Sequence, residues 1–161
     1  MGYSLKIITN EEINVTMNLR ELDQYLSQMK FQKIGKFFIK NSKYIIEYDQ
    51  KYSSLEKMIY IHVIDNQILR VGSSKNKFKD RMERWEKDVT KLLQNKKSDT
   101  PINEGDEWNN LLKNKVGILY GRQGTEIKTP VGKINIYLSE ESYLIGKHQP
   151  IMCKDRSRHK L

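Results

Sequence analysis

Tyr60, Arg70, Arg81 and Glu141 are the side chains of this sequence whose types fit the hydrolysis of a phosphodiester. That reaction needs a water as nucleophile, a group that takes or orients the water's proton, and positive charge near the phosphate. A tyrosine can act on the water, and an arginine can donate two hydrogen bonds to one phosphate. A single glutamate can hold Mg²⁺, because this ion prefers oxygen ligands and keeps most of its waters. We therefore predict that Arg81 binds phosphate and that Glu141 binds a metal.

Each of these side chains also has an ordinary structural explanation. Tyr60 stands in an aliphatic strand pattern and can be a core tyrosine with its hydroxyl at the rim. Glu141, like Glu140, can complement the dipole of a helix N-terminus. Arg81 can form an ion pair with Glu83. A free phenol is a poor base at neutral pH, but cations beside it favour phenolate, so the tyrosine and the arginines make most sense as one unit.

Residues 58–72, "MIYIHVIDNQILRVG", predict a β-hairpin, since two β-branched apolar runs flank residues 65–67. Side chains alternate between the two faces of a strand. A three-residue loop pairs position 60 with position 72 and places Tyr60, His62 and Arg70 on one face. A two-residue turn separates Tyr60 from Arg70 unless a bulge resets the register. We therefore predict the three-residue loop.

Two helices are expected to carry Arg81 and Glu141. After the hairpin, Ser74 or Asn76 can cap a helix. Its apolar residues recur at steps of four and three and form one buried stripe that Arg81 should flank. The members of that stripe are Phe78, Met82, Trp85, Val89 and Leu92. A closing helix, "EESYLIGK", is expected to start at a Ser139 cap and to carry Glu141 near its beginning.

The remaining pattern predicts an α+β fold, with a small antiparallel sheet flanked by helices. Residues 1–57 are expected to be an N-terminal α+β arm, with a helix near 17–29 and two strands about an Asn41-Ser42 turn. Residues 58–161 are expected to be the core, with a hairpin insert near 116–132. A polar loop is expected over residues 94–108, "QNKKSDTPINEGDEW", and a short helix is expected at "EWNNLLKN".

Composition favours a polyanion as the partner. The chain has 161 residues, a net charge of +9 and a pI of about 9.5, so it attracts nucleic acid at long range. No apolar run is long enough to cross a bilayer, and the first residues lack a signal-peptide pattern. The single cysteine, Cys153, excludes a disulfide within the chain and a cysteine zinc site. A cytoplasmic protein with no membrane partner is therefore expected.

The order and spacing of these residues resemble the GIY-YIG nuclease superfamily over residues 58–153. Residues 58–60 (MIY) and 70–72 (RVG) occupy the places of the family's Gly-Ile-Tyr and Tyr-Ile-Gly motifs. Arg81 occupies the place of its helix arginine. "ESYLIGKHQP", at 141–150, matches the family's late helix, and Glu141 occupies the place of the glutamate that opens it.

The sequence departs from the family pattern at four positions. Met58 replaces the first glycine, and Arg70 replaces the second tyrosine, where some restriction-enzyme members carry lysine. Trp85 stands where many members have His or Tyr, and Cys153 stands where an asparagine is frequent. The last two changes affect helper positions rather than Tyr60, Arg81 and Glu141.

The resemblance implies an endonuclease that hydrolyses DNA with Mg²⁺, or Mn²⁺ in its place, and favours a type II restriction enzyme. It implies the catalytic set Tyr60, Arg70, Arg81 and Glu141, with Glu141 as the metal ligand. The possible helpers are His62, Trp85 and His148, and His148 is expected to lie in a loop and face solvent. An enzyme that cuts both strands of a symmetric site is expected to be a homodimer on double-stranded DNA.

Further basic and polar residues are expected to contact DNA. Side chains after the hairpin can neutralise phosphates and make affinity depend on salt, although a merely solvated helix face is the alternative. Side chains of the insert are of types that bind base edges. The expected DNA-binding residues are Lys75, Lys77, Arg84, Arg122, Gln123 and Lys128. Two alternative functions remain: a structure-specific or mobile-element nuclease with the same chemistry, and a non-catalytic basic DNA-binding module.

Overall fold

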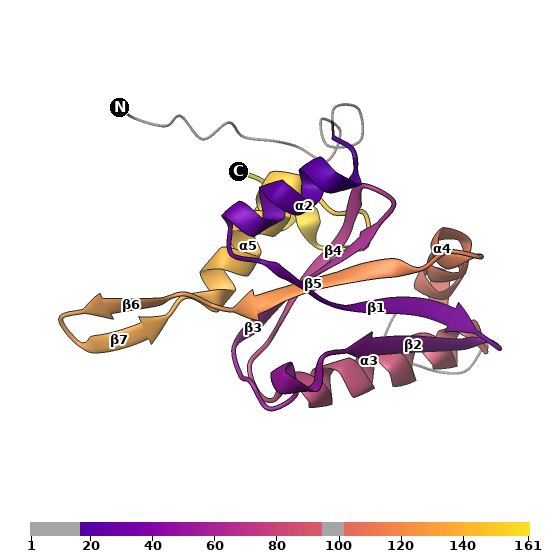
Figure 1. The fold of residues 1–161 in the computed structure, drawn as a ribbon, viewed down its shortest axis with the longest axis horizontal. Helices are drawn as coiled ribbons and strands as arrows, with labels where there is room; N and C mark the ends of the chain where they lie inside the picture. The colour runs from indigo at the N-terminus through magenta and orange to yellow at the C-terminus, as the bar shows by residue number, and fades with distance from the viewer. Residues whose placement is uncertain (1–16, 95–101) are drawn as a thin grey trace.

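The computed structural model describes residues 17–94 and 102–161, which form an α+β fold around a five-stranded sheet (Figure 1). None of the helices in this described part is long and apolar enough to cross a membrane. In chain order, the elements are α2 (Leu19–Gln28), β1 (Gln32–Lys40), β2 (Lys43–Tyr48), η1 (Gln50–Tyr52), β3 (Met58–Ile64), β4 (Gln67–Ser74), α3 (Phe78–Leu93), α4 (Ile102–Leu112), β5 (Gly117–Gln123), β6 (Glu126–Thr129), β7 (Gly132–Asn135), α5 (Tyr137–His148) and η2 (Arg156–His159).

The sheet has the strand order β2-β1-β5-β3-β4, and every neighbouring pair is antiparallel. β3 is buried along its whole length, because β5 and β4 flank it and helices cover both of its faces. The predicted fold class is therefore confirmed. β4 is an edge strand, which leaves one side of the hairpin without a strand partner.

Two helical layers bury the two faces of the sheet. α3 and α4 pack on one face, where Tyr60, Trp85 and Trp108 belong to one apolar cluster. α2 and α5 pack on the other face, in a cluster that includes Ile59 and Ile145. Because neighbouring residues of β3 point to opposite faces, Tyr60 lies on the α3 side of the sheet and Ile59 on the α5 side.

The segment expected to be an arm contributes α2, β1 and β2 to the same body. β1 pairs with β5 on one side and with β2 on the other, so these strands extend the sheet rather than form a second one. Asn41 and Ser42 form the predicted turn, each with a left-handed backbone, φ 52° and 59°. Residues 1–16 of the expected arm lie outside the described residues, and a domain boundary at 57 stays a prediction.

The segment expected to be an insert, residues 116–132, has two different roles. β5 is the middle strand of the main sheet, between β1 and β3. The projecting ribbon is β6 with β7, which starts and ends later than expected and stands away from the body (Figure 1). The sequence pattern of alternating strands could not show which strand finds partners in the sheet, since that depends on distant β1 and β3.

The hairpin of β3 and β4 has a two-residue turn, so the predicted three-residue loop is wrong. Ile64 pairs with Gln67, and Asp65 takes a left-handed backbone with φ 55°. A register shift then follows between the pairs His62–Arg70 and Val63–Ile68. This bulge restores the pairing of position 60 with position 72, which was predicted. Tyr60, His62 and Arg70 are therefore placed on one face after all.

The helix boundaries differ from those expected. Neither Ser74 nor Asn76 caps α3, because β4 continues through Ser74, which pairs with Met58. α5 begins at Tyr137 instead of after Ser139, since the Asn135 side chain accepts the backbone N–H of Tyr137. α4 begins at Ile102, inside the expected polar loop, and residues 95–101 of that loop lie outside the described residues.

Candidate active site

The Tyr60 hydroxyl accepts hydrogen bonds from two donors on α3. Trp85 Nε1 donates to it at 2.7 Å and Arg81 Nε at 3.3 Å. The two donors are four residues apart, so one face of the helix presents both. Donors directed at one oxygen stabilise negative charge there. Tyr60 itself has 0% exposed surface, so its hydroxyl is covered by these side chains.

Gly72 makes room for the Tyr60 ring. It pairs with Tyr60 across the hairpin, and a Cβ at this position would lie 2.6 Å from both Cζ and Oη of Tyr60. Any other residue would therefore displace the phenol from its two donors. The requirement here is space, and it explains the glycine of the RVG segment.

Arg70 belongs to the same contact network. Its guanidinium lies over the Trp85 ring, 4.2 Å from the centroid, and Nη1 donates to the Met152 carbonyl oxygen at 2.7 Å. Arg70, Arg81 and Trp85 also line one hollow of about 240 Å³, together with Arg84 and Asp88. The structure thus brings together Tyr60 and both predicted catalytic arginines.

Glu141 makes its contact on the other side of edge strand β4. It accepts a hydrogen bond from Ser73 Oγ, at the end of β4. Ser73 pairs with Ile59 rather than with Tyr60, so it points to the α5 side of the sheet. The predicted residues therefore approach the end of β4 from two layers, Arg81 from α3 and Glu141 from α5.

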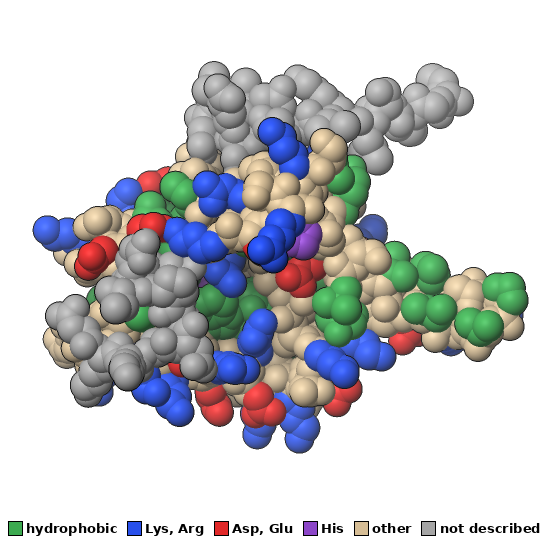
Figure 2. Space-filling view, turned by 180° about the vertical axis from the view of Figure 1, so that it is seen from behind, with side chains coloured by type: hydrophobic (Ala, Val, Ile, Leu, Met, Phe, Trp, Pro, Cys, Tyr) green, Lys and Arg blue, Asp and Glu red, His purple; other side chains and the backbone are tan. Residues whose placement is uncertain are grey.

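A hollow of about 540 Å³ connects these two groups of contacts. It contains Ser73 and Arg81 and lies between the loop that precedes α3 and the first turn of α5. Its lining residues are Ser73, Ser74, Lys75, Asn76, Lys77, Asp80, Arg81, Arg84, Tyr137 and Leu138. Lys75, Lys77 and Arg84 are exposed, as DNA-binding residues must be. Figure 2 shows lysine and arginine side chains along the lower edge, where α3 lies, with acidic side chains between them.

His62 is placed beside Tyr60 but inside the core. Its ring centroid lies 5.7 Å from that of Tyr60, and Phe37, Trp85 and Trp108 surround it. Burial, and then the charge of Arg70, lowers the pKa of His62 to about 3. Neither ring nitrogen has a hydrogen-bond partner among the described residues. His62 is therefore neutral at physiological pH and supports the Tyr60 ring by packing.

His148 does not face solvent, so that prediction is wrong. It ends α5, is 1% exposed, and its Nε2 lies 2.9 Å from the Tyr25 hydroxyl of α2. Burial, with a smaller effect of Lys147, lowers its pKa to about 4. The helix extends through His148 because Gln149 ends it with a left-handed backbone, φ 46°. His148 lines neither of the two hollows that contain Arg81.

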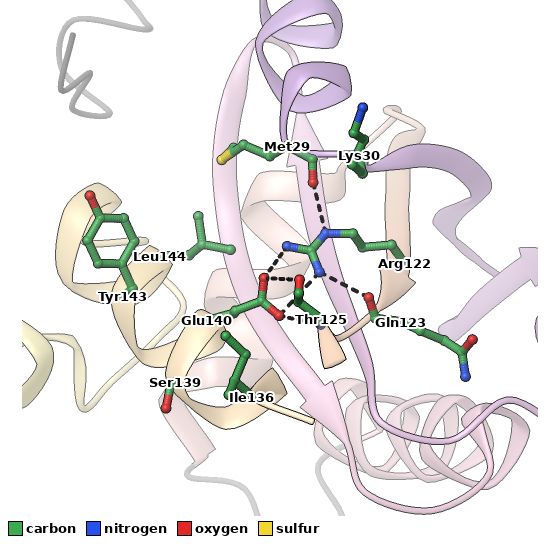
Figure 3. A pocket seen from close by; sticks show the side chains of 10 residues that line it. All are labelled: Met29, Lys30, Arg122, Gln123, Thr125, Ile136, Ser139, Glu140, Tyr143 and Leu144. Carbon is green, nitrogen blue, oxygen red and sulfur yellow. Dashed lines mark hydrogen bonds and ion pairs between the residues drawn. The ribbon is translucent and has the colours of Figure 1, made fainter. Parts of the chain in front are cut away.

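Arg122, expected to contact DNA, is held in an ion pair (Figure 3). Nη2 lies 2.5 Å from Glu140 Oε2, and the two side chains are 16% and 18% exposed. Nε donates to the Met29 carbonyl oxygen at 2.8 Å. Burial alone would raise the Glu140 pKa, but hydrogen bonds from Arg122 and Thr125 hold it below its usual value. Arg122 thus fixes the start of α5, the helix that carries Glu141.

The other two residues expected to bind base edges are exposed. Gln123 Nε2 donates to the Glu56 carbonyl oxygen at 3.2 Å, and Lys128 stands on the β6–β7 ribbon. A cavity of about 650 Å³ lies beside Arg122 and Gln123. Figure 3 shows that the Arg122–Glu140 pair occupies its wall. This cavity is larger than the hollow at Arg81, but Arg122 and Glu140 in its wall already neutralise each other.

Sequence reasoning did not assign a role to Ser73 and could not place Cys153. Cys153 Sγ donates to the Val71 carbonyl oxygen at 3.4 Å. Burial raises the pKa of this thiol, and the charges of Arg70 and Glu141 both act on it. Cys153 therefore lies within electrostatic reach of both sides of the site. The Ser-Ser pair after Gly72 was the available signal for Ser73, but a helix cap was the simpler interpretation.

The candidate metal site around Glu141 offers few protein ligands, so it suits a cation that can keep most of its waters. Among residues 17–94 and 102–161, no group of three or more His, Cys, Asp or Glu side chains could hold a metal. A tetrahedral zinc site needs three or four such ligands. Mg²⁺ can be bound through one carboxylate, water and substrate phosphate oxygens. Glu141 with the neighbouring Ser73 hydroxyl fits Mg²⁺ and does not fit zinc.

No family model and no curated protein matches this sequence. Solved structures with a similar fold include the following two. One is a mutant of bacteriophage T4 EndoII, with 16% sequence identity and a TM-score of 0.56 over 81% of this chain and 97% of that chain. The other is the restriction endonuclease HPY188I in complex with product DNA, with 15% identity and a TM-score of 0.51 over 93% of each chain. At such identities the likeness establishes the fold.

Proposed function

We propose that this protein is a metal-dependent DNA endonuclease of the GIY-YIG type that hydrolyses phosphodiester bonds. The observation that carries the proposal is the pair of N–H donors on the Tyr60 hydroxyl, beside a hollow that contains both Arg81 and Ser73. Ser73 in turn contacts Glu141. The fold adds support, since one similar structure is a restriction endonuclease with product DNA.

In the proposed mechanism, Tyr60 reacts as the phenolate and takes the proton of the attacking water, which leaves it a neutral phenol. Trp85 and Arg81 stabilise charge on the phenol oxygen, and Arg70 adds positive charge from behind the Trp85 ring. The phosphate enters the hollow and receives hydrogen bonds from Arg81. Because Tyr60 has no exposed surface, the water reaches the hydroxyl only after Arg81 turns toward the phosphate, and Trp85 then stays as the donor on the phenolate oxygen. Glu141 would hold Mg²⁺, or Mn²⁺, whose charge stabilises the phosphate and the leaving oxygen.

DNA is the proposed substrate because the hollow is surrounded by cations. Lys75 and Lys77 stand on the loop before α3, and Arg84 follows Arg81 on the helix. These side chains are positioned to neutralise phosphates on either side of the bond that is cut, so affinity should fall steeply with salt. Lys128, on the projecting ribbon, and Gln123, at the end of β5, are the proposed contacts to base edges.

A type II restriction enzyme is the form of this activity that we propose. Such an enzyme cuts both strands of a symmetric site. A homodimer can do this, because each chain supplies one active site for one strand. We also propose that the protein acts in the cytoplasm. A structure-specific or mobile-element nuclease would have the same chemistry. Discrete fragments from linear DNA support the restriction enzyme, and nicks confined to branched DNA support the other nuclease.

The test of the proposal is the Glu141→Gln variant, which keeps the shape of the side chain and removes its charge. We expect it to lose plasmid cleavage in Mg²⁺ while it still binds DNA in a gel-shift assay. Glu47→Gln is the matched control, because this exposed carboxylate on β2 forms its ion pair with Lys36, at 3.4 Å and also exposed, far from the candidate site. Cleavage by Glu141→Gln at the rate of Glu47→Gln contradicts the proposal.

A non-catalytic DNA-binding module is the second candidate function. The observation in its favour is the complete burial of Tyr60, which separates the phenol from solvent. In that case the Tyr60 hydroxyl serves to anchor α3 on the sheet through Trp85 and Arg81. DNA binding without cleavage in either Mg²⁺ or Mn²⁺ distinguishes this candidate from the nuclease.

A further inference from the structure

The contact between Ser73 and Glu141 joins elements that are far apart in the sequence. Ser73 Oγ, at the end of β4, donates to Glu141 Oε2 on α5, 68 residues away. Ser73 is 8% exposed and Glu141 is partly buried, so water does not freely replace this contact. The two oxygens are therefore held together by the fold.

Helix capping does not account for Glu141. α5 begins at Tyr137, and the acidic residue of its first turn is Glu140. Glu140 accepts the backbone N–H of Thr125 at 2.6 Å and the Arg122 guanidinium. The role of a carboxylate at a helix N-terminus thus belongs to Glu140. Glu141 lies beyond this turn, and Ser73 is the side chain that contacts it.

We propose that the Ser73 hydroxyl and the Glu141 carboxylate together form a two-oxygen binding site for one divalent cation. This inference rests on the proposed nuclease function and adds Ser73 as a metal ligand. The contact brings one hydroxyl oxygen and one carboxylate oxygen side by side, and Mg²⁺ prefers oxygen ligands of both kinds. A cation bound here would take one ligand from β4 and one from α5.

The surroundings of Ser73 suit a cation that meets a phosphate. Ser73 lines the same hollow as Arg81, Lys75 and Lys77, so a phosphate held there lies next to the hydroxyl. A serine hydroxyl can coordinate Mg²⁺ through a lone pair while it donates its proton to a carboxylate. The described residues offer no group of three acidic or histidine ligands, so water and phosphate oxygens complete the coordination.

The proposal is tested by cation binding to the full chain without DNA. Mn²⁺ is titrated into wild type and variants, and free Mn²⁺ is measured by electron paramagnetic resonance. We expect Ser73→Ala to bind Mn²⁺ at least about tenfold more weakly and Ser73→Thr, which keeps the hydroxyl, to bind like wild type. Ser142→Ala is the matched control, since Ser142 adjoins Glu141 on α5 but pairs with His159 at 2.7 Å. We expect it to bind Mn²⁺ like wild type.

A second variant tests whether the Ser73 oxygen touches the cation. Ser73→Cys offers a thiolate, which prefers softer metals to Mg²⁺. We expect this variant to bind Cd²⁺ at least about tenfold more tightly than wild type does and to bind Mn²⁺ more weakly. Circular dichroism and thermal melting confirm that each variant is folded before its binding is compared.

The outcomes separate this inference from the proposed function. If wild type cuts DNA and Ser73→Ala binds Mn²⁺ as tightly as Ser142→Ala, Ser73 is not a ligand and the nuclease proposal stands. An unchanged Cd²⁺ affinity in Ser73→Cys also overturns the role of Ser73. If wild type neither binds Mn²⁺ nor cuts DNA, both proposals fail together.

Discussion

Replacing Trp85 with phenylalanine removes one of the two donors on Tyr60 and keeps an aromatic ring in the core. Trp85 Nε1 lies 2.7 Å from the Tyr60 hydroxyl, and the side chain is 9% exposed, so water does not take the place of the lost N–H. A hydrogen bond to a charged group contributes about 1.5–3 kcal/mol. If the phenol oxygen carries negative charge during the reaction, Trp85→Phe should lower kcat by roughly 10- to 150-fold, with little change in KM.

The matched control for this variant is Trp108→Phe. Trp108 is fully buried in the same cluster, and its Nε1 has no hydrogen-bond partner among the described residues. Both variants lose similar packing, but only Trp85→Phe also loses a donor to Tyr60. The difference between their rates therefore measures the effect of that donor. The assay is single-turnover cleavage of supercoiled plasmid in Mg²⁺ with each protein in excess. A rate for Trp85→Phe within twofold of the rate for Trp108→Phe would refute the role of the phenol oxygen.

Three further predictions follow from the packing and the charges. Gly72→Ala is expected to lower the free energy of unfolding by about 1–3 kcal/mol and to abolish cleavage, because its Cβ meets Tyr60 Oη at 2.6 Å; an unchanged melting temperature contradicts this. Arg122→Met is expected to lower the free energy of unfolding by about 2–4 kcal/mol at neutral pH, while the folded variant keeps its affinity for DNA. This loss of stability should shrink as pH falls below 4.5, because the pKa of Glu140 is lowered in the folded state. A loss that does not depend on pH argues against the Arg122–Glu140 ion pair. His62→Phe is expected to make the free energy of unfolding depend less on pH. Between pH 6.5 and about 3, His62 binds a proton in the unfolded chain but not in the folded protein. Wild-type stability should fall with pH in that window by up to about 1.4 kcal/mol per unit more than the variant's, as urea titrations at several pH values will show.

The sequence predicted the parts of the site that depend on local periodicity. The apolar stripe of α3 placed Trp85 in the core and Arg81 at its margin, and both contact Tyr60. The pairing of position 60 with Gly72 was also predicted, although from the wrong loop length. The sequence analysis named a bulge as the exception that would restore this pairing, but it could not place the bulge near Leu69. Local residue types do not specify where one strand gains a residue.

The parts that the sequence did not predict depend on partners that are distant along the chain. Arg122 is of a residue type that often contacts DNA, but its ion pair with Glu140, 18 residues later, and its hydrogen bond to the Met29 carbonyl oxygen make it part of the fold. His148 looked like a loop residue, and the Tyr25 hydroxyl that holds it is 123 residues away. Ser73 had no expected role, because its partner Glu141 lies on α5, 68 residues later. Such pairings depend on how the layers pack, which the pattern of a single segment does not contain.

Cleavage of DNA by the purified wild-type protein tests the central claim most directly. The protein is incubated with a long natural DNA in Mg²⁺, in Mn²⁺ and in a chelator, and the ends produced are sequenced. The proposed function predicts cuts that need the metal, share a recognition sequence and disappear in Glu141→Gln. DNA that stays intact in both metals, although the protein binds it, contradicts an endonuclease and favours the non-catalytic binding module.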